Sequence, residues 1–293
     1  MRRTGRIQGG NGMTHQTQLL PEDREAFAAD VKVGLLATVN GDGLPHLTLI
    51  TTLEAASPTE LTWGQFCEGE SKRHIRGNPR TGFLVMSLDR RLWRGRALWT
   101  RAETEGDAYV RYNRKPMWRY NAYFGIHTVH FMDLVSLHSG EALPLPGIVA
   151  GALLTRLAKG ARKTGRAERI LTPWAEGLFN RLDALKFLAV IDADGFPAIV
   201  PLLQAQAADS RRLVFAPTVY REDLRDLQPG DPVAVLGLTL DMENCLVRGP
   251  FAGFTRARGV PLGVIDLDWV YNSMPPIPGQ IYPAKPLEPV TRF

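Results

Sequence analysis

The sequence contains very little cysteine. Among its 293 residues only Cys67 and Cys245 occur, and neither belongs to a C-x-x-C pair or to a cluster with histidines. Structural zinc and a disulfide framework are therefore not expected, because both need several cysteines or histidines at short spacings. We expect no metal site, and this sparing use of cysteine predicts a reducing, cytoplasmic location.

Long apolar runs are absent as well. No segment reaches the roughly 18 residues that a membrane-spanning helix needs, so no membrane partner is expected. Residues 1–19 are polar and rich in glycine, without the apolar stretch of a secretory signal. We expect a disordered N-terminal extension there, with translation starting at Met1 or at Met13.

Neither a large charge imbalance nor a known catalytic motif is present. The net charge is +5, and basic residues gather in the segments 90–101, 111–119 and 159–169. No nucleic-acid-binding motif accompanies them, so solvated faces or a small anionic ligand are the better interpretation. The nucleophile motifs G-x-S-x-G and H-E-x-x-H are missing, and the histidines form no recognisable ligand set. We therefore assign no catalytic residue.

What the sequence does contain is an internal repeat. Residues 20–50 align with residues 172–202 without a gap, at a constant offset of 152. The aligned pairs include structure-determining residues: Pro21 with Pro173, Gly43 with Gly195 and Pro45 with Pro197. Repeats of this kind indicate duplicated structural units. We expect a first unit at 20–146, a linker at 147–170 and a second unit at 171–293.

Each unit has the pattern of a small β-barrel. In the first unit, a proline at the first turn predicts a short helix at 21–30. Asn40-Gly41-Asp42-Gly43 predicts the turn of a hairpin, because these residues tolerate positive φ. The expected strands are 34–39, 45–52, 61–65, 82–88, 94–103 and 129–137, with a helical turn at 71–77. Six short strands with one or two helices per unit predict a mainly β (α+β) fold of two tandem six-stranded antiparallel barrels.

The linker should contain an amphipathic helix. Val149, Leu153, Leu154 and Leu157 fall on one helical face, and a basic stretch follows from Lys159. We expect this apolar face to pack on the protein itself. Binding to a membrane surface or to a calmodulin-like partner is the alternative.

Two segments of the first unit resemble a known superfamily. Gly34-Leu-Leu-Ala-Thr-Val-Asn-Gly-Asp-Gly-Leu-Pro-His46 is similar to the opening hairpin of the pyridoxamine 5′-phosphate oxidase-like, FMN-binding split barrels. Ser71-Lys-Arg-His-Ile-Arg-Gly-Asn-Pro79 is similar to their S-K-x-x-x-I-x-x-N-P segment, with one residue fewer between Lys72 and Ile75. In that superfamily two barrels pair and FMN lies in the groove between them. The resemblance therefore implies an intramolecular pseudo-dimer, existing as a monomer or as a further homodimer.

The resemblance also implies cofactor-binding residues. Ser71, Lys72 and Arg73 would hold the FMN phosphate, since a phosphate needs cations and hydroxyl or amide donors. The second unit has Arg221-Glu222-Asp223 at the matching place, and these carboxylates would repel a phosphate, so we expect one intact site. The residues implied to contact the flavin ring are Thr48, Leu49, Ile50, Thr51, Trp63, Gly64 and Gln65, with Arg96 and Trp99 facing the ring or the ribityl chain.

The function implied is an FMN-dependent oxidoreductase that transfers hydride through flavin N5 to or from a small molecule. Thr51 or Gln65 would donate a hydrogen bond near N5 or N1. Two alternatives remain: a non-catalytic FMN- or haem-binding protein, and a deazaflavin (F420)-dependent reductase on the same fold. Substrate contacts are expected from residues 109–124 and from the proline-rich tail that begins at Met274.

Overall fold

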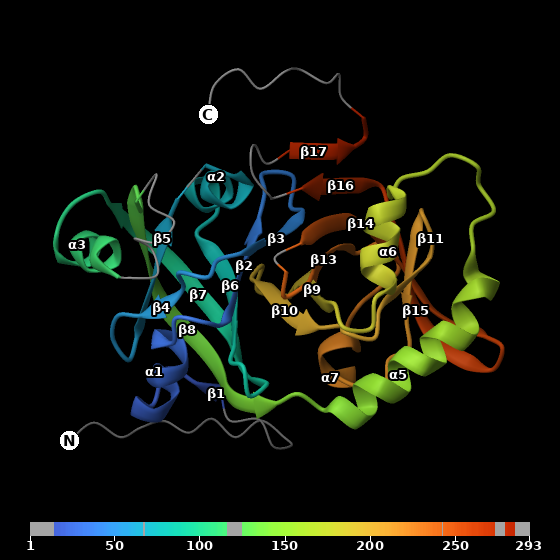
Figure 1. Ribbon diagram of the computed structural model, residues 1–293, viewed down its shortest axis with the longest axis horizontal. Coiled ribbons are helices and arrows are strands. Elements are labelled where there is room, and N and C mark those ends of the chain that lie inside the picture. Colours follow the sequence, from blue (N-terminus) through green and yellow to red (C-terminus); the bar gives the residue numbers. More distant parts are fainter. Residues whose placement is uncertain (1–14, 67, 116–124, 242, 273–278, 285–293) are drawn as a thin grey trace. The chain divides into compact units, whose positions relative to one another are not determined.

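The protein is built around two antiparallel β-sheets with short helices, as the computed structural model in Figure 1 shows. The structure describes residues 15–66, 68–115, 125–241, 243–272 and 279–284. The tail from Met274 and most of the segment 109–124, both expected to contact substrate, therefore lie largely outside the described residues. Within the described residues no helix is both long and apolar enough to cross a membrane.

The first sheet has eight strands. Seven of them lie in the order β3-β2-β6-β7-β8-β5-β4, and β1 pairs with β8. The elements of this half are β1 (His15–Gln16), α1 (Pro21–Ala28), β2 (Val33–Val39), β3 (Pro45–Leu49), β4 (Glu54–Ala55), β5 (Glu60–Gln65), α2 (Glu70–Gly77), β6 (Arg80–Met86), β7 (Arg91–Glu103), α3 (Asp107–Arg114) and β8 (Thr128–Ala142).

The second sheet has nine strands and repeats this order. Seven of its strands lie in the order β10-β9-β13-β14-β15-β12-β11, while β16 pairs with β14 and β17. The elements are α5 (Leu145–Ala158), the 3₁₀ helix η1 (Lys159–Arg162), α6 (Pro173–Asn180), β9 (Leu185–Ile191), β10 (Pro197–Pro201), β11 (Gln206–Asp209), β12 (Arg212–Phe215), α7 (Arg221–Leu224), β13 (Pro232–Leu238), β14 (Asn244–Ala257), β15 (Val260–Asp266), β16 (Trp269–Asn272) and β17 (Gly279–Tyr282).

The predicted mainly β fold with two antiparallel sheets is confirmed, with one addition. Each sheet path contains one strand more than the six expected, because β4 and β11 each add a short strand. β4 has two residues and β11 has four, too few to show the alternation by which a strand is recognised in a sequence.

Equivalent positions of the two repeats make equivalent hydrogen bonds. In the first hairpin Asn40 Oδ1 accepts from Asp42 N at 3.0 Å and Leu44 N at 2.8 Å. In the second, Asp192 Oδ1 accepts from Asp194 N at 2.9 Å and Phe196 N at 3.0 Å. The bond from Ile50 N to Gly34 O likewise has its counterpart from Leu202 N to Lys186 O. These pairs keep the 152-residue offset of the alignment.

Two matching glycines let neighbouring strands approach closely. Gly95 lies in β7 and Gly249 in β14. A Cβ atom on Gly95 would lie 2.0 Å from the carbonyl oxygen of Ser136, and one on Gly249 would lie 1.8 Å from that of Asp266. Any larger residue would clash with backbone at both places, so the sheets themselves require these glycines.

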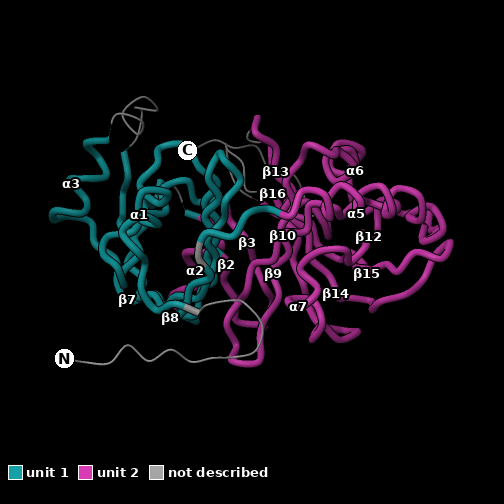
Figure 2. Tube along the Cα trace, turned by 90° about the horizontal axis from the view of Figure 1, so that it is seen from below, with its two compact units in different colours: residues 1–36, 49–68, 78–143 teal, residues 37–48, 69–77, 144–293 magenta. Residues whose placement is uncertain are grey.

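The chain divides into two compact units that do not coincide with the two repeats (Figure 2). The first unit contains residues 1–36, 49–68 and 78–143. The second contains residues 37–48 and 69–77 together with 144–293. The tip of the first hairpin and helix α2 are thus part of the same compact unit as the whole second repeat. The boundaries expected from the repeat, 20–146 and 171–293, place both of these segments in the first unit instead.

The start of the described chain is tied to the first sheet. His15 and Gln16 pair with His138 and Leu137 of β8. Leu19 is buried, and its backbone N–H donates to Pro58 O at 2.7 Å. Of the disordered extension expected at residues 1–19, the last five residues are instead placed against the first sheet. Residues 1–14 lie outside the described residues.

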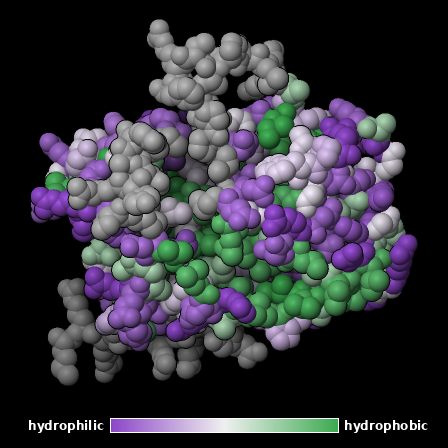
Figure 3. Space-filling view, viewed as in Figure 1, coloured by the Kyte–Doolittle hydropathy of each residue, from purple (hydrophilic) through white to green (hydrophobic). Residues whose placement is uncertain are grey.

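The linker helix α5 buries a different face from the one predicted. Val149, Leu153 and Leu157 are 57%, 54% and 64% exposed. The buried face consists of Ile148, Gly151, Thr155 and Ala158. Figure 3 shows apolar side chains gathered along the lower edge of the molecule, where α5 runs in Figure 1. Of the four predicted residues only Leu154 packs, partly buried, against the protein, and the other three are left in solvent.

Candidate functional site

Two hydroxyl groups and a lysine meet at the first turn of helix α2. Thr48, just before the end of β3, is hydrogen-bonded through Oγ1 to Ser71 Oγ. Ser71 and Lys72 are both buried. Because the first turn of a helix presents free N–H groups and a partial positive charge, this is a place where an anion can be bound. The structure thus brings together three of the predicted phosphate and ring contacts.

Arg73, the third predicted phosphate ligand, points elsewhere. Its side chain is 64% exposed, and Nη1 donates to Glu70 Oε1 at 2.8 Å. Consecutive helical residues project about 100° apart, so Lys72 and Arg73 cannot both face the buried side of α2. The same Glu70 lies 3.6 Å from Nε2 of His74. Its carboxylate is therefore held by two neighbours on the helix's own surface.

Two histidines beside α2 are kept neutral by their surroundings. His74 Nδ1 is 3.0 Å from Thr38 Oγ1, and its ring lies 5.2 Å from that of His46 in an edge-to-face contact. Burial lowers the pKa of His46 well below its ordinary value, and the positive charge of Arg248 and Lys72 adds to this. Burial likewise lowers the pKa of His74, while Glu70 opposes the shift. Besides burial, the cations that act on these two histidines are Arg248, Lys72 and Arg73.

The second repeat contributes an aromatic cluster to this region of the second unit. The ring of His46 lies 5.3 Å from that of Tyr271 and 6.2 Å from that of Trp269. Trp269 and Tyr271 stack on each other at 5.3 Å and 7°. The Arg248 guanidinium lies 4.3 Å above the Trp269 ring. Sequence reasoning missed these residues, because no motif in the second repeat marks them.

A pocket of about 400 Å³ opens beside this cluster. Arg248, Asp268 and Trp269 line it together with Leu44 from the tip of the first hairpin. Burial lowers the pKa of Arg248 and raises that of Asp268, and each charge opposes the shift of the other. The pocket therefore combines an aromatic face with one group of each charge.

The predicted ring contacts on β5 and β7 form a buried network in the first unit. Trp63 is fully buried and stacks on His130 at 3.8 Å and 11°. Trp99 Nε1 lies 3.2 Å from His130 Nδ1, and His130 Nε2 lies 2.7 Å from Gln65 Oε1. An indole N–H can only donate, so His130 accepts at Nδ1 and donates from Nε2.

This network runs on from Gln65 to a surface carboxylate. Gln65 Nε2 donates to Glu68 Oε1 at 2.9 Å. Because His130 is a donor at Nε2, the orientation of the Gln65 amide is determined: its oxygen faces the histidine and its nitrogen faces Glu68. His130 is buried, and it links two predicted site residues.

The remaining predicted ring contacts have varied surroundings. β3 ends at Leu49, so Ile50 and Thr51 lie past the strand that was expected to reach residue 52. The chain turns there because Ile50 N donates to Gly34 O, and a Cβ on Gly34 would lie only 2.3 Å from Ile50 O. A Cβ on Gly64 would meet the Ile126 side chain at 2.1 Å. Arg96 is half-buried in β7.

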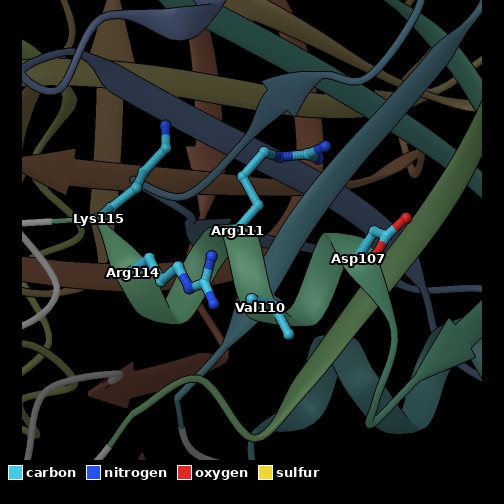
Figure 4. A pocket seen from close by; sticks show the side chains of 5 residues that line it. All are labelled: Asp107, Val110, Arg111, Arg114 and Lys115. Atoms are coloured by element: carbon cyan, nitrogen blue, oxygen red, sulfur yellow. The ribbon is translucent and has the colours of Figure 1, made fainter.

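A second, basic pocket lies on α3 in the first unit. It measures about 480 Å³ and is lined by Asp107, Val110, Arg111, Arg114 and Lys115. In Figure 4 Arg111 and Lys115 extend to the same side of the helix, while Asp107 lies at its far end. Lys115 is already ion-paired with Glu54. Nowhere among the described residues are three His, Cys, Asp or Glu side chains placed to hold a metal ion.

Comparison with known proteins gives matches to structures only. No protein-family model and no curated protein matches the chain. An FMN-binding protein from Syntrophomonas wolfei is 16% identical, with a TM-score of 0.35, over 39% of this chain and 81% of its own. An F420 reductase is 20% identical, with a TM-score of 0.32, over 40% of this chain and 98% of its own. A FAD-binding protein from Mesorhizobium loti is 18% identical, with a TM-score of 0.28, over 43% of this chain and 96% of its own.

These neighbours are of the kind that the sequence resemblance predicts, and each corresponds to about two fifths of this chain. All three identities are below 25% and all three TM-scores below 0.5. The architecture therefore rests on this chain's own strands, their order and their matching hydrogen bonds.

Proposed function

We propose that this protein is an FMN-dependent oxidoreductase that holds the FMN phosphate at the first turn of α2. The observation that carries the proposal is the contact between the Thr48 and Ser71 hydroxyls beside buried Lys72. Hydroxyl donors, free helix N–H groups and one cation are the groups that bind a phosphate. Bound FMN would supply hydride transfer through its N5.

The electrostatics of the second unit support an anionic ligand. Lys72 and Arg248 lower the pKa of His46, so two positive charges act on the same neighbourhood. Burial lowers the pKa of Arg248 while Asp268, Asp42 and Glu70 oppose this shift, and Glu70 is already paired with Arg73. An added phosphate would relieve the mutual repulsion of the two cations.

The ring contacts remain predictions from the sequence resemblance. They comprise Leu49, Ile50, Thr51, Trp63, Gly64, Gln65, Arg96 and Trp99. For Gln65 the structure adds one detail, since its amide nitrogen faces Glu68 and its oxygen is used by His130. The substrate, a cytoplasmic location and the choice between monomer and homodimer stay predictions as well.

The decisive experiment compares FMN with riboflavin, which lacks only the phosphate. We expect purified protein to bind FMN, with absorption near roughly 450 nm, and to bind riboflavin at least about 30-fold more weakly, the scale of losing charge-assisted hydrogen bonds. Equal affinity for the two would contradict a phosphate site. A Soret band near roughly 400 nm on adding haem, with no response to FMN, would favour the haem-binding alternative.

The pocket on α3 favours a deazaflavin (F420) as the second candidate. This cofactor carries an acidic tail, and Arg111 and Arg114 supply cations beside a pocket of about 480 Å³. If a deazaflavin is the cofactor, Arg111→Ala with Arg114→Ala should lower its affinity about tenfold and leave FMN binding unchanged. Fluorescence titration with each cofactor separates the two candidates.

A further inference from the structure

Helix α5 exposes an aliphatic stripe that the described residues leave uncovered. Val149, Leu153 and Leu157 follow one another at spacings of four residues, and each is more than half exposed. With a rise of about 1.5 Å per residue the stripe is about 12 Å long. It forms a convex ridge on one side of the helix, with Pro146 and Ala150 also exposed beside it.

The helix cannot turn to bury this stripe, because its other face is locked to the second sheet. Thr155 Oγ1 accepts from Ala216 N at 2.8 Å, and Gln206 Nε2 donates to Ala152 O at 2.8 Å. A Cβ on Gly151 would lie 2.3 Å from Thr218 Oγ1. Close packing and hydrogen bonds therefore hold Gly151 and Thr155 against the second sheet, and Leu153 on the opposite side stays in solvent.

The charged residues of the segment that contains α5 are all positive. Residues 142–167 include five basic residues and no acidic one. Arg156 is exposed within α5 itself. Arg258, also exposed, donates from Nη1 to Leu157 O at 3.0 Å, which places its guanidinium at the end of the stripe. The surface thus presents aliphatic groups flanked by cations.

We propose that α5 docks on an anionic phospholipid surface. Val149, Leu153 and Leu157 enter the boundary between headgroups and acyl chains, and Arg156 and Arg258 contact lipid phosphates. A second copy of this chain fits less well, since a twofold contact would bring Arg156 and Arg258 of both copies close together. A bilayer also accepts a convex ridge without needing a matching groove. This proposal reverses the expectation that the apolar face packs on the protein and that no membrane is involved.

The test is co-sedimentation of the full-length protein with vesicles. Wild-type protein should bind vesicles of phosphatidylcholine mixed with phosphatidylserine, bind pure phosphatidylcholine much more weakly, and be released by salt. Leu153→Gln with Leu157→Gln should lower the partition coefficient about tenfold or more. Arg156→Gln with Arg258→Gln should lower it by about the same factor on the anionic vesicles.

The matched control is Leu182→Gln with Leu240→Gln, which alters two leucines of the same unit that are 56% and 77% exposed. This variant should bind like the wild type, and all variants should keep the wild-type melting temperature. Absence of binding to anionic vesicles overturns the proposal, as does equal binding to neutral ones or equal loss in the control. A concentration-dependent dimer that the Leu153 and Leu157 substitutions abolish, without vesicle binding, assigns the stripe to a second copy and also overturns it.

Discussion

Helices α2 and α7 occupy the same place in their repeats, between β5 and β6 and between β12 and β13 respectively. α2 has eight residues and buries Ser71, Lys72 and Ile75. α7 has four residues and buries only Leu224. The exposed Arg221 donates to Pro217 O at 2.8 Å, and Glu222 pairs with Arg225 at 3.0 Å. Both helices belong to the second unit.

The difference shows that side-chain chemistry has diverged between the repeats while strand order has been kept. The two sheets share their order and their hairpin hydrogen bonds, which depend on backbone and turn residues. The groups that could hold an anion are present at α2 and replaced by surface ion pairs at α7. The resemblance-based prediction of one intact site agrees with this contrast, and binding experiments have to test it.

The largest effect should come from a feature that both repeats share. We expect Gly95→Ala and Gly249→Ala each to lower the free energy of unfolding by about 3 kcal/mol or more, because the new Cβ would collide with a neighbouring backbone oxygen. Urea unfolding measures the loss. Gly177→Ala is the control: nothing lies within 4 Å of the added Cβ in helix α6, so a gain of about 0.5 kcal/mol is expected. Tolerance of either strand substitution would show that the close approach is not required.

The next prediction uses a position where the repeats differ, Gly34 in the first and Lys186 in the second. Lys186 is fully buried, and burial lowers its pKa from 10.5 to about 8. Between these pH values the unfolded chain binds more protons than the folded one, so the cost of burying the charge is full below pH 8 and disappears as pH rises.

We therefore expect the stability of wild-type protein to rise by about 3 kcal/mol relative to Lys186→Met between pH 8 and 10.5. Urea unfolding across this pH range measures the difference. Lys163→Met, at an exposed lysine, serves as the control and should follow the wild type. A constant difference between wild type and Lys186→Met would mean that folding leaves the pKa of Lys186 unchanged, which contradicts the lowered value.

Removing basic side chains from α2 and from α7 tests whether only α2 binds the FMN phosphate. Lys72→Ala with Arg73→Ala should weaken FMN binding by about 2–4 kcal/mol, and Lys72→Ala alone should account for about 2 kcal/mol of this. Arg73→Ala alone should have a small effect, because its side chain is exposed and bound to Glu70. Flavin fluorescence quenching reports the affinity. If Arg221→Ala weakened binding instead, the site would belong to the second repeat.

A smaller effect is expected where α1 and α6 begin. Thr172 caps α6, since its side chain accepts from Ala175 N at 3.2 Å, whereas Leu20 at the same place before α1 makes no side-chain cap. Thr172→Ala should cost about 1 kcal/mol, and Leu20→Thr should add up to about 1 kcal/mol. Chemical denaturation of both variants would show whether the repeats can be made equal. A loss of stability in Leu20→Thr would mean that the partly exposed leucine matters more than the missing cap.

The last substitution is expected to leave the stoichiometry of FMN binding unchanged. Replacing Arg221, Glu222 and Asp223 by Ser, Lys and Arg copies the α2 motif into α7, but that helix is short and its first residues are exposed. Because burial and a neighbouring hydroxyl are still missing, FMN should bind with a stoichiometry of one per chain, as in the wild type. A second bound FMN, detected by equilibrium dialysis, would show that the three side chains alone make a site.

Much of the fold could be read from local chemistry. Asn40 and Asp192 predict their hairpin turns, because a short polar side chain can accept hydrogen bonds from backbone N–H groups two and four residues later. These bonds are local and do not depend on tertiary contacts. Pro21 and Pro173 mark helix starts for a similar reason. The end of β3 at Leu49 was harder to predict, since it depends on the approach of Gly34 to Ile50, sixteen positions further along the chain.

The candidate site was predictable only where a motif exists. Ser71 and Lys72 stand in a recognisable segment, whereas His130, Arg248, Trp269 and Tyr271 do not. His130 matters because it lies between Trp99 and Gln65, and Arg248 because it lies over Trp269. These contacts join residues from different strands, and no short pattern in a single sequence encodes them.

By itself, the sequence determined that this chain carries two repeats, each with the same hairpin turn and helix start, because those features follow from the conformational preferences of a few neighbouring residues. The tertiary structure alone decided that the first hairpin tip and α2 join the compact unit of the second repeat. It also decided that α5 turns Gly151 and Thr155 inward and Leu153 and Leu157 outward. Periodicity shows which residues share a helix face, but only packing against the second sheet selects the face that is buried.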